Sequence, residues 1–474
     1  MILHAIKTFD FAICGNNTGA LVAAIELGKK HQVAIINPAP NWGAHFAGFP
    51  FNGENFDIGM NFFEFTTFHK SSTDLMTYNP AVRNDSARFF KLIEQYIASR
   101  IEYIEVDAID VLCDGTYAKD IVMANSLDIL QKLPKDVLQK IRSEVEAILK
   151  NGDKKLHASQ KKLNEELFLN TNYYEVSIAN HGKTFHDLFI EPLCKKIFNM
   201  TSKDCPALLH RIVWAPLFYP ETLLKGLNGE EDLAPTLFHY PKKAYFSAIT
   251  DAFMAEIRAN KNITIITQKI NNLKKNNHYE IEFDTETISA NQVVWCNDLL
   301  SLLQTAKAKL FEYTPQKASV TVAFCFLDKA NILKQFSSLY VCDNSNPLYR
   351  ITNQEYSAKK NDSNTIKLVF EFNLDVLNEY GFDTNEKVID SINSFLTKNG
   401  IIKTPIKSEL ITIKAIKNAV NMPTLYNFNN FEKLSNLTQN LLPEVELIGP
   451  ASGFVSTSFN DQVVQALKIG KKYN

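Results

Sequence analysis

A short turn near the N-terminus has the residue types and spacing that could hold a diphosphate. It begins at Gly15 and continues through Asn17, Thr18, Gly19 and Ala20. Glycines in such a turn let backbone N–H groups approach a pyrophosphate that lies at the positive end of a helix. Against the pattern Gly-x-Gly-x-x-Gly/Ala, Gly15 and Ala20 fit, whereas Asn17 stands where the second glycine should be. The spacing predicts a dinucleotide site, and a turn that binds nothing is the alternative.

The residues around this turn predict the elements that would position it. Residues 9–14 form a short apolar run, as in a strand buried on both faces of a parallel sheet. Apolar residues then recur at helical spacing over 21–27, and 33–36 is a second apolar run, so a βαβ unit is expected. The second strand ends at Asn37, where a Glu or Asp would hold a ribose hydroxyl. The amide oxygen of Asn37 can still accept a hydrogen bond.

Composition limits the class of ligand. The 474 residues are 45% hydrophobic and 22% charged, which predicts an ordinary globular chain of two or three domains. A net charge of −2 gives no reason to expect nucleic acid or an anionic membrane, so a small-molecule partner is expected, with a homodimer as an option. Seven cysteines without paired CxxC spacing predict reduced thiols in a cytoplasm and no metal site. Neither a signal peptide nor a membrane span is expected.

A glycine-punctuated loop after the βαβ unit runs into the sequence FDIG. This order of motifs resembles the FAD-dependent flavoproteins of the amine oxidase, protoporphyrinogen oxidase and UDP-galactopyranose mutase superfamily. Gly43, Asp57 and Gly59 match the family pattern. In that family the second glycine of the loop and a following Arg or Asn lie along the FAD, but this chain has Ala44 and His45 there. The resemblance implies FAD as the cofactor.

The end of the chain carries another part of the resemblance. Its sequence predicts a strand, a glycine-containing turn and a final amphipathic helix, which is similar to the last FAD-contacting element of the superfamily. Gly449 and Gly453 remain, and Pro450 replaces the expected arginine. Asn460 with Asp461 could cap the helix, whose N-terminal amides would face the flavin or its pyrophosphate.

The resemblance covers nearly the whole chain and implies its architecture. The segment GKTFHDLFIEPLCKKIFN is similar to a family segment in which Pro192, Lys196 and Phe198 fall in place. The implied fold class is α/β, with a Rossmann-like FAD-binding domain, an inserted helical domain and an antiparallel-sheet substrate domain. The predicted ranges are 1–69, 236–305 and 440–474 for the discontinuous FAD-binding domain, 70–235 for the mainly helical inserted domain and 306–439 for the antiparallel-sheet substrate domain.

The segment NPLYRI is the most informative part of the second half of the chain. In mutase-like relatives a similar segment places an arginine over the substrate pocket, where a guanidinium can hold a phosphate or carboxylate with two hydrogen bonds. The resemblance therefore implies substrate binding by Arg350 and its neighbour Tyr349. A surface salt bridge for Arg350 and packing for Tyr349 are the alternatives.

The leading functional hypothesis is an FAD-dependent oxidoreductase that removes a hydride from a small or medium polar, anionic substrate. The alternatives are a mutase-like, non-redox flavoenzyme acting on a nucleotide sugar, and a flavin-fold protein without turnover. No catalytic base can be named, because each histidine also fits a structural role, and His45 alone lies in a loop expected near the flavin. The residues predicted to contact FAD are Gly15, Asn17, Thr18, Gly19, Ala20, Asn37, Gly43, Ala44, His45, Asp57, Gly59, Gly449, Gly453, Asn460 and Asp461.

Overall fold

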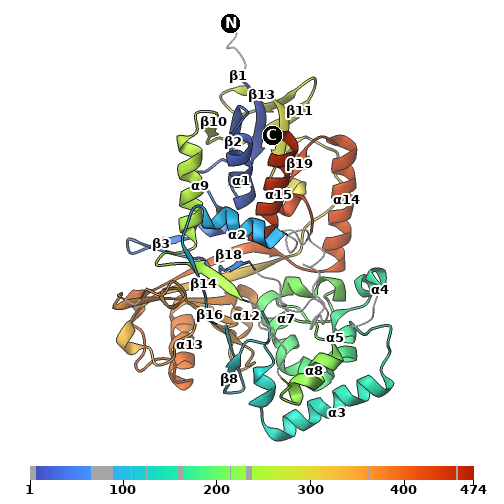
Figure 1. Cartoon of the computed structure of the whole chain (residues 1–474), viewed down its shortest axis with the longest axis vertical. Helices are drawn as coiled ribbons and strands as arrows, with labels where there is room; N and C mark the ends of the chain where they lie inside the picture. The colour runs from blue at the N-terminus through green and yellow to red at the C-terminus, as the bar shows by residue number, and fades with distance from the viewer. Residues whose placement is uncertain are drawn as a thin grey trace.

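A computed structural model of the chain shows a mixed α/β fold with parallel and antiparallel sheets and many helices (Figure 1). The structure describes residues 7–65, 89–107, 109–123, 126–158, 164–213, 215–230, 237–360, 362–454 and 457–474. No helix within these ranges is long and apolar enough to cross a membrane. The domain boundaries expected from the sequence remain a prediction.

The first sheet is built around the strand that precedes the glycine turn. Its strands run in the order β10-β2-β1-β13-β12-β11, and β19 pairs with β13. The pairs among β10, β2, β1, β13 and β19 are parallel, while β12 and β11 form an antiparallel extension. The bounds are β1 (Lys7–Cys14), β2 (Val33–Ile36), β10 (Ile263–Ile266), β11 (Asn272–Lys275), β12 (Tyr279–Glu282), β13 (Thr287–Trp295) and β19 (Glu446–Leu447). The sheet therefore joins both ends and the middle of the chain.

Helices cover both faces of this sheet. On one face α1 (Thr18–Leu27) lies beside α15 (Phe459–Tyr473), with α9 (Ser247–Ala259) on its other side (Figure 1). Nearly every residue of α1 is buried, which explains why its sequence is apolar all round rather than amphipathic. The opposite face packs on α10 (Leu299–Thr305) and α14 (Leu425–Leu441). The predicted βαβ unit of β1, α1 and β2 is thus present.

The second sheet has the order β18-β14-β17-β16-β15-β7-β8, and its pairs are antiparallel except for β15 with β7. Its apolar face packs on α13 (Asn385–Lys398). The bounds are β7 (Asp110–Cys113), β8 (Thr116–Lys119), β14 (Lys317–Asp328), β15 (Ser338–Val341), β16 (Arg350–Asn353), β17 (Thr365–Asn373) and β18 (Ile411–Asn421). The β7–β8 hairpin comes from the segment expected to be mainly helical, and it extends this sheet.

The remaining helices lie mostly below the first sheet in Figure 1. Their bounds are α2 (Phe90–Ala98), α3 (Lys135–Asn151), α4 (Glu165–Asn170), α5 (Tyr173–His181), α6 (Lys183–Phe185), α7 (Glu191–Phe198), α8 (Pro220–Leu227), α11 (Gln354–Ser357) and α12 (Leu374–Glu379). Two small sheets are formed by β3 (Phe49–Phe51) with β4 (Glu54–Phe56), and by β5 (Phe63–Glu64), β9 (Phe238–Pro241) and β6 (Tyr103–Glu105).

Lys196 of α7 joins the helical segment to the second sheet. Its ammonium group is buried and donates to the carbonyls of Val341 at 2.9 Å and Leu348 at 3.1 Å, and also to that of Asp343. Burial lowers the pKa of this lysine to about 8. Three carbonyl acceptors compensate for the loss of water around the charge, so Lys196 has a structural role in the matched family segment.

Candidate functional site

Gly15 ends β1 and begins the turn toward α1. Its φ is +136°, a value that glycine adopts readily, and its N–H donates to the Ile36 carbonyl at 2.9 Å. A side chain here would place its Cβ 2.9 Å from the Cβ of Cys296, just beyond β13. Packing of the turn on this neighbouring segment therefore requires a glycine independently of any ligand.

The backbone amides at the start of α1 have partners within the chain. The Ala20 N–H donates to Asn17 Oδ1 at 3.0 Å, which makes Asn17 the N-cap of the helix. The Gly19 N–H donates to Oε1 of Gln462, in the first turn of α15, at 3.2 Å. Thr18, the first helical residue, is buried. The helix end at which a diphosphate would lie is thus bound by two neutral side chains.

The same two side chains also act as donors. Asn17 Nδ2 donates to the Cys296 carbonyl at 2.6 Å, and Gln462 Nε2 donates to the Thr457 carbonyl at 2.8 Å. We refer to Asn17 and Gln462 as the amide pair. Each member accepts at one end and donates at the other, so both are held in place from two sides. Gln462 was absent from the predicted site because nothing in the local sequence marks it.

The C-terminal turn contacts the N-terminal one directly. Gly449 has a φ of +63°, and its N–H donates to Gln465 Oε1 at 2.7 Å. A Cβ at Gly449 would lie 3.1 Å from Asn17 Nδ2. Gly453 follows in the same turn and is half-buried. The structure brings the two predicted halves of the site together, and their side chains fill the contact between them.

The start of α15 differs from the sequence prediction. Its N-cap is Ser458, whose Oγ accepts from the Asp461 N–H at 3.1 Å and donates to Asp461 Oδ2 at 2.7 Å. The prediction that Asn460 and Asp461 cap the helix is therefore wrong. The capping-box spacing Ser-x-x-Asp was the signal that would have identified Ser458. Asn460 instead donates to the Glu64 carbonyl at 2.7 Å and is buried.

The position expected to hold a ribose is tied to its own loop. Asn37 is buried, and its Nδ2 donates to Asn41 Oδ1 at 3.2 Å and to the Ala39 carbonyl. Asn16 Nδ2 donates to the Asn41 carbonyl at 2.7 Å, and the Gly43 N–H donates to the Asn16 carbonyl at 2.7 Å. The loop that follows β2 is thus fastened to the glycine turn by its own hydrogen bonds.

The next residues of this loop pack in different ways. Gly43 has a φ of +95°, and a Cβ there would collide with Thr250 of α9. Ala44 has a positive φ of +51°, which a non-glycine residue rarely adopts. His45 is exposed, and its ring centroid lies 3.8 Å from that of Phe46. These contacts explain Gly43 by packing, and among the described residues the His45 ring contacts that of Phe46.

Asp57 links the FDIG segment to the start of α9. Its carboxylate accepts from the Tyr240 hydroxyl, from the Phe246 N–H at 2.9 Å and from the Ser247 N–H at 3.4 Å. Burial raises the pKa of Asp57 to about 6, although these hydrogen bonds oppose the shift. A Cβ at Gly59, where φ is +75°, would lie 2.9 Å from the Glu371 carboxylate. Asp57 therefore has hydrogen-bond partners within the chain, and Gly59 packs closely against Glu371.

Arg350 lies on β16 beside a buried carboxylate. Its Nε donates to Glu371 Oε1 at 2.7 Å and its Nη2 to Oε2, while Nη1 donates to the Tyr340 hydroxyl at 3.0 Å. The Tyr349 hydroxyl donates to Glu371 Oε2 at 3.2 Å. Arg350, Tyr349 and Glu371 are all buried. A substrate anion could use the Arg350 guanidinium only by sharing or replacing Glu371.

Several solved structures are similar to this chain over nearly its whole length. The chain is similar to reduced UDP-galactopyranose mutase, with 14% identity, a TM-score of 0.70, and 98% of this chain and 95% of that chain covered. It is also similar to a protein from an Exiguobacterium species assigned as a protoporphyrinogen oxidase (12% identity, TM-score 0.66, 99% and 98% covered). A third similar structure is cyclohexylamine oxidase from Brevibacterium oxydans (10% identity, TM-score 0.59, 98% and 99% covered). No family model matches the sequence, and no curated protein sequence does.

The fold is that of the amine oxidase-like flavoproteins. The resemblance stated from the sequence is thereby confirmed at the level of the fold. Such proteins hold FAD, so the glycine turn can be tested against the pyrophosphate of that cofactor. A Cβ at Gly15, Gly19 or Gly449 would meet protein atoms rather than open space. Because Asn17 and Gln462 also bind the helix amides, the turn does not fit a pyrophosphate as it stands.

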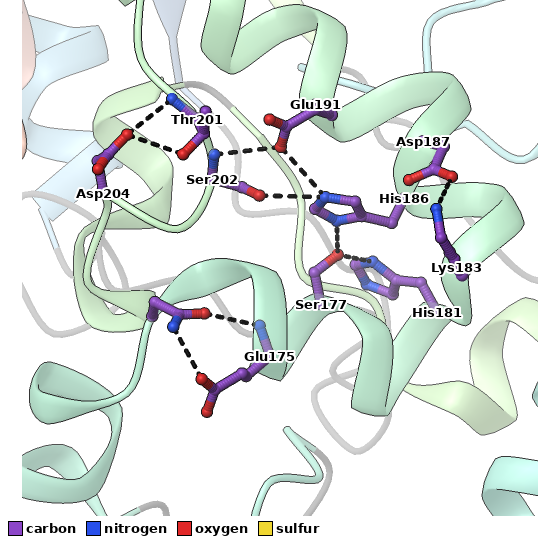
Figure 2. A network of polar contacts seen from close by, with 11 residues as sticks. Glu175, Ser177, His181, Lys183, His186, Asp187, Glu191, Thr201, Ser202 and Asp204 are labelled. Atoms are coloured by element: carbon purple, nitrogen blue, oxygen red, sulfur yellow. Dashed lines mark hydrogen bonds and ion pairs between the residues drawn. The ribbon is translucent and has the colours of Figure 1, made fainter.

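A second polar cluster lies in the helical segment (Figure 2). Ser177 Oγ is 3.0 Å from His181 Nδ1 and 2.8 Å from His186 Nδ1, and His186 Nε2 is 3.3 Å from Glu191 Oε2 and 3.1 Å from Ser202 Oγ. This order of serine, histidine and carboxylate is that of a hydrolytic triad. The side chains of Ser177, His181, His186 and Ser202 are fully buried, however. No substrate can reach the hydroxyl, so we assign this histidine cluster a structural role.

One cavity lies away from the residues of the glycine turn and of the histidine cluster. Its volume is about 990 Å³, and it lies between the segment at 309–312 and one face of α14. A smaller cavity of about 260 Å³ lies along β10. None of the predicted cofactor or substrate residues lines either one.

Proposed function

We propose that this chain is a binding or scaffolding protein with the flavoenzyme fold, and that it carries out no flavin redox chemistry. The observation that supports this proposal is the occupation of the α1 amides by the chain itself, with Gly19 bound to Gln462 and Ala20 bound to Asn17. In a protein of this fold those amides are the groups that would hold the cofactor diphosphate. The third functional hypothesis from the sequence is therefore the one that the geometry favours.

The energetic cost of displacing the amide pair supports the same conclusion. A diphosphate at the start of α1 would break four hydrogen bonds, which join Asn17 to Ala20 and Cys296, and Gln462 to Gly19 and Thr457. At about 1 kcal/mol each, their loss would cost about 4 kcal/mol. That cost weakens binding by roughly a thousandfold. Neutral residues at Asn37, Ala44 and Pro450 offer no charge to offset it.

The visible absorption spectrum of the purified protein tests this proposal. We expect no flavin absorption and no FAD among the small molecules released on denaturation. Incubation with excess FAD followed by dialysis should leave the protein colourless. A protein that purifies yellow, with about one FAD per chain, would contradict the proposal.

The FAD-dependent oxidoreductase remains the second candidate, because the fold similarity extends over almost the full length of known oxidases. In that case the flavin would accept a hydride, and Arg350 would orient an anionic substrate after exchange of its partner Glu371. A yellow protein that is bleached by a substrate without oxygen would support it. Yellow protein that interconverts a nucleotide sugar without net bleaching would support the mutase-like alternative.

A further inference from the structure

We infer that Asn17 and Gln462 together act as a built-in plug of the dinucleotide site, taking the place of a diphosphate at the N-terminus of α1. This inference rests on the proposed function and identifies the two side chains that would exclude the cofactor. It differs from a general erosion of the site, in which the substitutions at Asn37, Ala44 and Pro450 would matter equally. Only the amide pair directly occupies the N–H groups of Gly19 and Ala20.

The hydrogen bonding explains why both members of the pair are amides. Each side chain must accept from a helix N–H and donate to a carbonyl, namely that of Cys296 for Asn17 and that of Thr457 for Gln462. A carboxylate could accept but could not donate. A glycine at position 17 would leave both the Ala20 N–H and the Cys296 carbonyl without this partner. The chemistry of the plug therefore selects Asn and Gln at these positions.

The surroundings of the pair hold it in place. Gln462 is buried, as is Ile448, whose side chain occupies the space next to Gly19. Gln465 fixes the Gly449 N–H in the segment that faces Asn17. The two members come from opposite ends of the chain. Asn17 lies near the N-terminus, and Gln462 lies 443 residues beyond Gly19, the residue to which it is hydrogen-bonded. The plug thus also ties the C-terminal helix to the first βαβ unit.

The opened site should accept the diphosphate of an adenine dinucleotide. Removing both side chains in the variant Asn17→Gly/Gln462→Ala restores the second glycine of the motif and frees the amides of Gly19 and Ala20. We expect this variant to bind added FAD at least about tenfold more tightly than the parent chain, since the four hydrogen bonds that FAD would have to displace in the parent are absent. Isothermal titration with FAD, and separately with ADP, measures the gain.

A matched control uses the same substitution at a different helix. Asn164 caps α4 by accepting from the Leu167 N–H at 3.0 Å, and it lies far from α1 in the chain. Asn164→Gly should leave FAD binding as weak as in the parent. Asn17→Asp gives a second contrast, because it replaces the donor to the Cys296 carbonyl by a carboxylate oxygen that this carbonyl repels, which should turn the side chain away from the Ala20 N–H. It should raise the exchange rate of the Ala20 amide about tenfold, whereas Asn164→Asp should leave the Leu167 amide unchanged.

Hydrogen exchange in the parent chain tests the plug even if the double variant fails to fold. The amides of Gly19 and Ala20 should exchange slowly without any ligand, and added FAD should not slow them further. Exchange of these amides as fast as in an unbonded turn would overturn the plug. A folded, FAD-free double variant that gains no affinity would overturn it while leaving the proposed function intact. A parent chain that purifies with bound FAD would overturn both.

Discussion

The glycine turn and the histidine cluster of the helical segment both hold polar groups that are satisfied from within the chain, but by different chemistry. The turn is bound by amide side chains, which keep the same charge at every ordinary pH. The cluster around Ser177 is built from ring nitrogens and a carboxylate, which titrate. Two regions whose polar groups are all hydrogen-bonded within the chain can therefore still respond differently to acid.

The direction of hydrogen bonding in the cluster follows from one backbone donor. The Phe218 N–H donates to His181 Nε2 at 2.9 Å, so the proton of that ring is on Nδ1 and is donated to Ser177. The Ser177 hydroxyl then donates to His186 Nδ1, and His186 Nε2–H faces Glu191 and Ser202. Because His181 Nε2 accepts from a backbone N–H, this ring must be neutral for the hydrogen bond to form. No such requirement exists in the amide pair.

The largest expected effect is that of acid, which should lower the stability of the histidine cluster much more than that of the glycine turn. Burial, followed by the nearby His186 and His210, holds the pKa of His181 well below 6.5, and burial lowers the pKa of His210 to about 3. Because these folded-state pKa values are depressed, stability is complete above pH 6.5 and is lost as the pH falls below it. At about pH 5 the buried neutral His181 of α5 should cost about 2 kcal/mol. His210, whose ring stacks on Tyr173 of the same helix, should cost about 2 kcal/mol more.

The measurement is the opening free energy of α5 from hydrogen exchange, corrected for intrinsic rates at each pH. A local measurement is needed because Asp57, whose pKa is raised to about 6 by burial, acts in the opposite sense elsewhere. The amides of Gly19 and Ala20 should show no comparable change. Equal losses in α5 and in the turn would remove the distinction between the two regions.

Removing the central hydroxyl of the cluster should have the next largest effect. In Ser177→Ala the buried His181 Nδ1–H and His186 Nδ1 would both lose their partner. Alanine fits a helix well, so the cost of about 3 kcal/mol would come from the unpaired groups. The midpoint of urea unfolding followed by helical circular dichroism measures it. A midpoint equal to that of the parent would mean that the cluster contributes nothing to stability.

Local sequence patterns predict much of the first sheet, but they did not lead to a prediction of the β7–β8 hairpin in the second sheet. The strands and helix on either side of Gly15 were predicted because apolar periodicity is local. The β7–β8 hairpin was missed, although Asp114 and Gly115 have positive φ values of 46° and 76° and form the Asp-Gly turn typical of a two-residue hairpin. The Asp-Gly dipeptide is therefore the local sequence signal for this hairpin.

The partners within the candidate site could not have been predicted in this way. Gln462 is hydrogen-bonded to Gly19 although the two are 443 residues apart, and no sequence pattern near either residue predicts the pairing. Likewise the resemblance drew attention to Arg350 without showing that Glu371 on the next strand would neutralise it. Motif spacing identifies where a ligand lies in relatives, whereas the contents of that space depend on tertiary contacts.

Filling the space beside α1 should destabilise the turn by less than the changes in the cluster. In Gly19→Ala the new Cβ would collide with Ile448, which should cost about 2 kcal/mol despite the better helix propensity of alanine. Combining it with Ile448→Ala makes room for the new atom. The double variant should therefore be more stable than the sum of the single effects predicts, by thermal unfolding. Strict additivity would mean that the two side chains do not meet.

The smallest effect is expected at Asn37, where the sequence pattern predicts a ribose contact. Asn37→Asp keeps the size of the side chain but removes the Nδ2 donor to Asn41 Oδ1 and to the Ala39 carbonyl. Because the exposed Asn41 amide can turn its NH2 group toward the new carboxylate, the cost should be about 1 kcal/mol. FAD binding should not change, because the plug and not the ribose position excludes the cofactor. Thermal unfolding and FAD titration measure the two effects separately.

Asn180 in the helical segment provides a matched substitution for Asn37→Asp. It is fully buried, and its Nδ2 donates to the Leu156 and Val176 carbonyls, both at 2.8 Å, while its Oδ1 accepts from the Ala158 N–H at 2.8 Å. Asn180→Asp would bring a carboxylate against two carbonyl oxygens away from water, so it should destabilise the chain more than Asn37→Asp does. If Asn37→Asp alone produced saturable FAD binding, the lack of a carboxylate at position 37 would explain weak FAD binding by the parent chain better than an internal plug does.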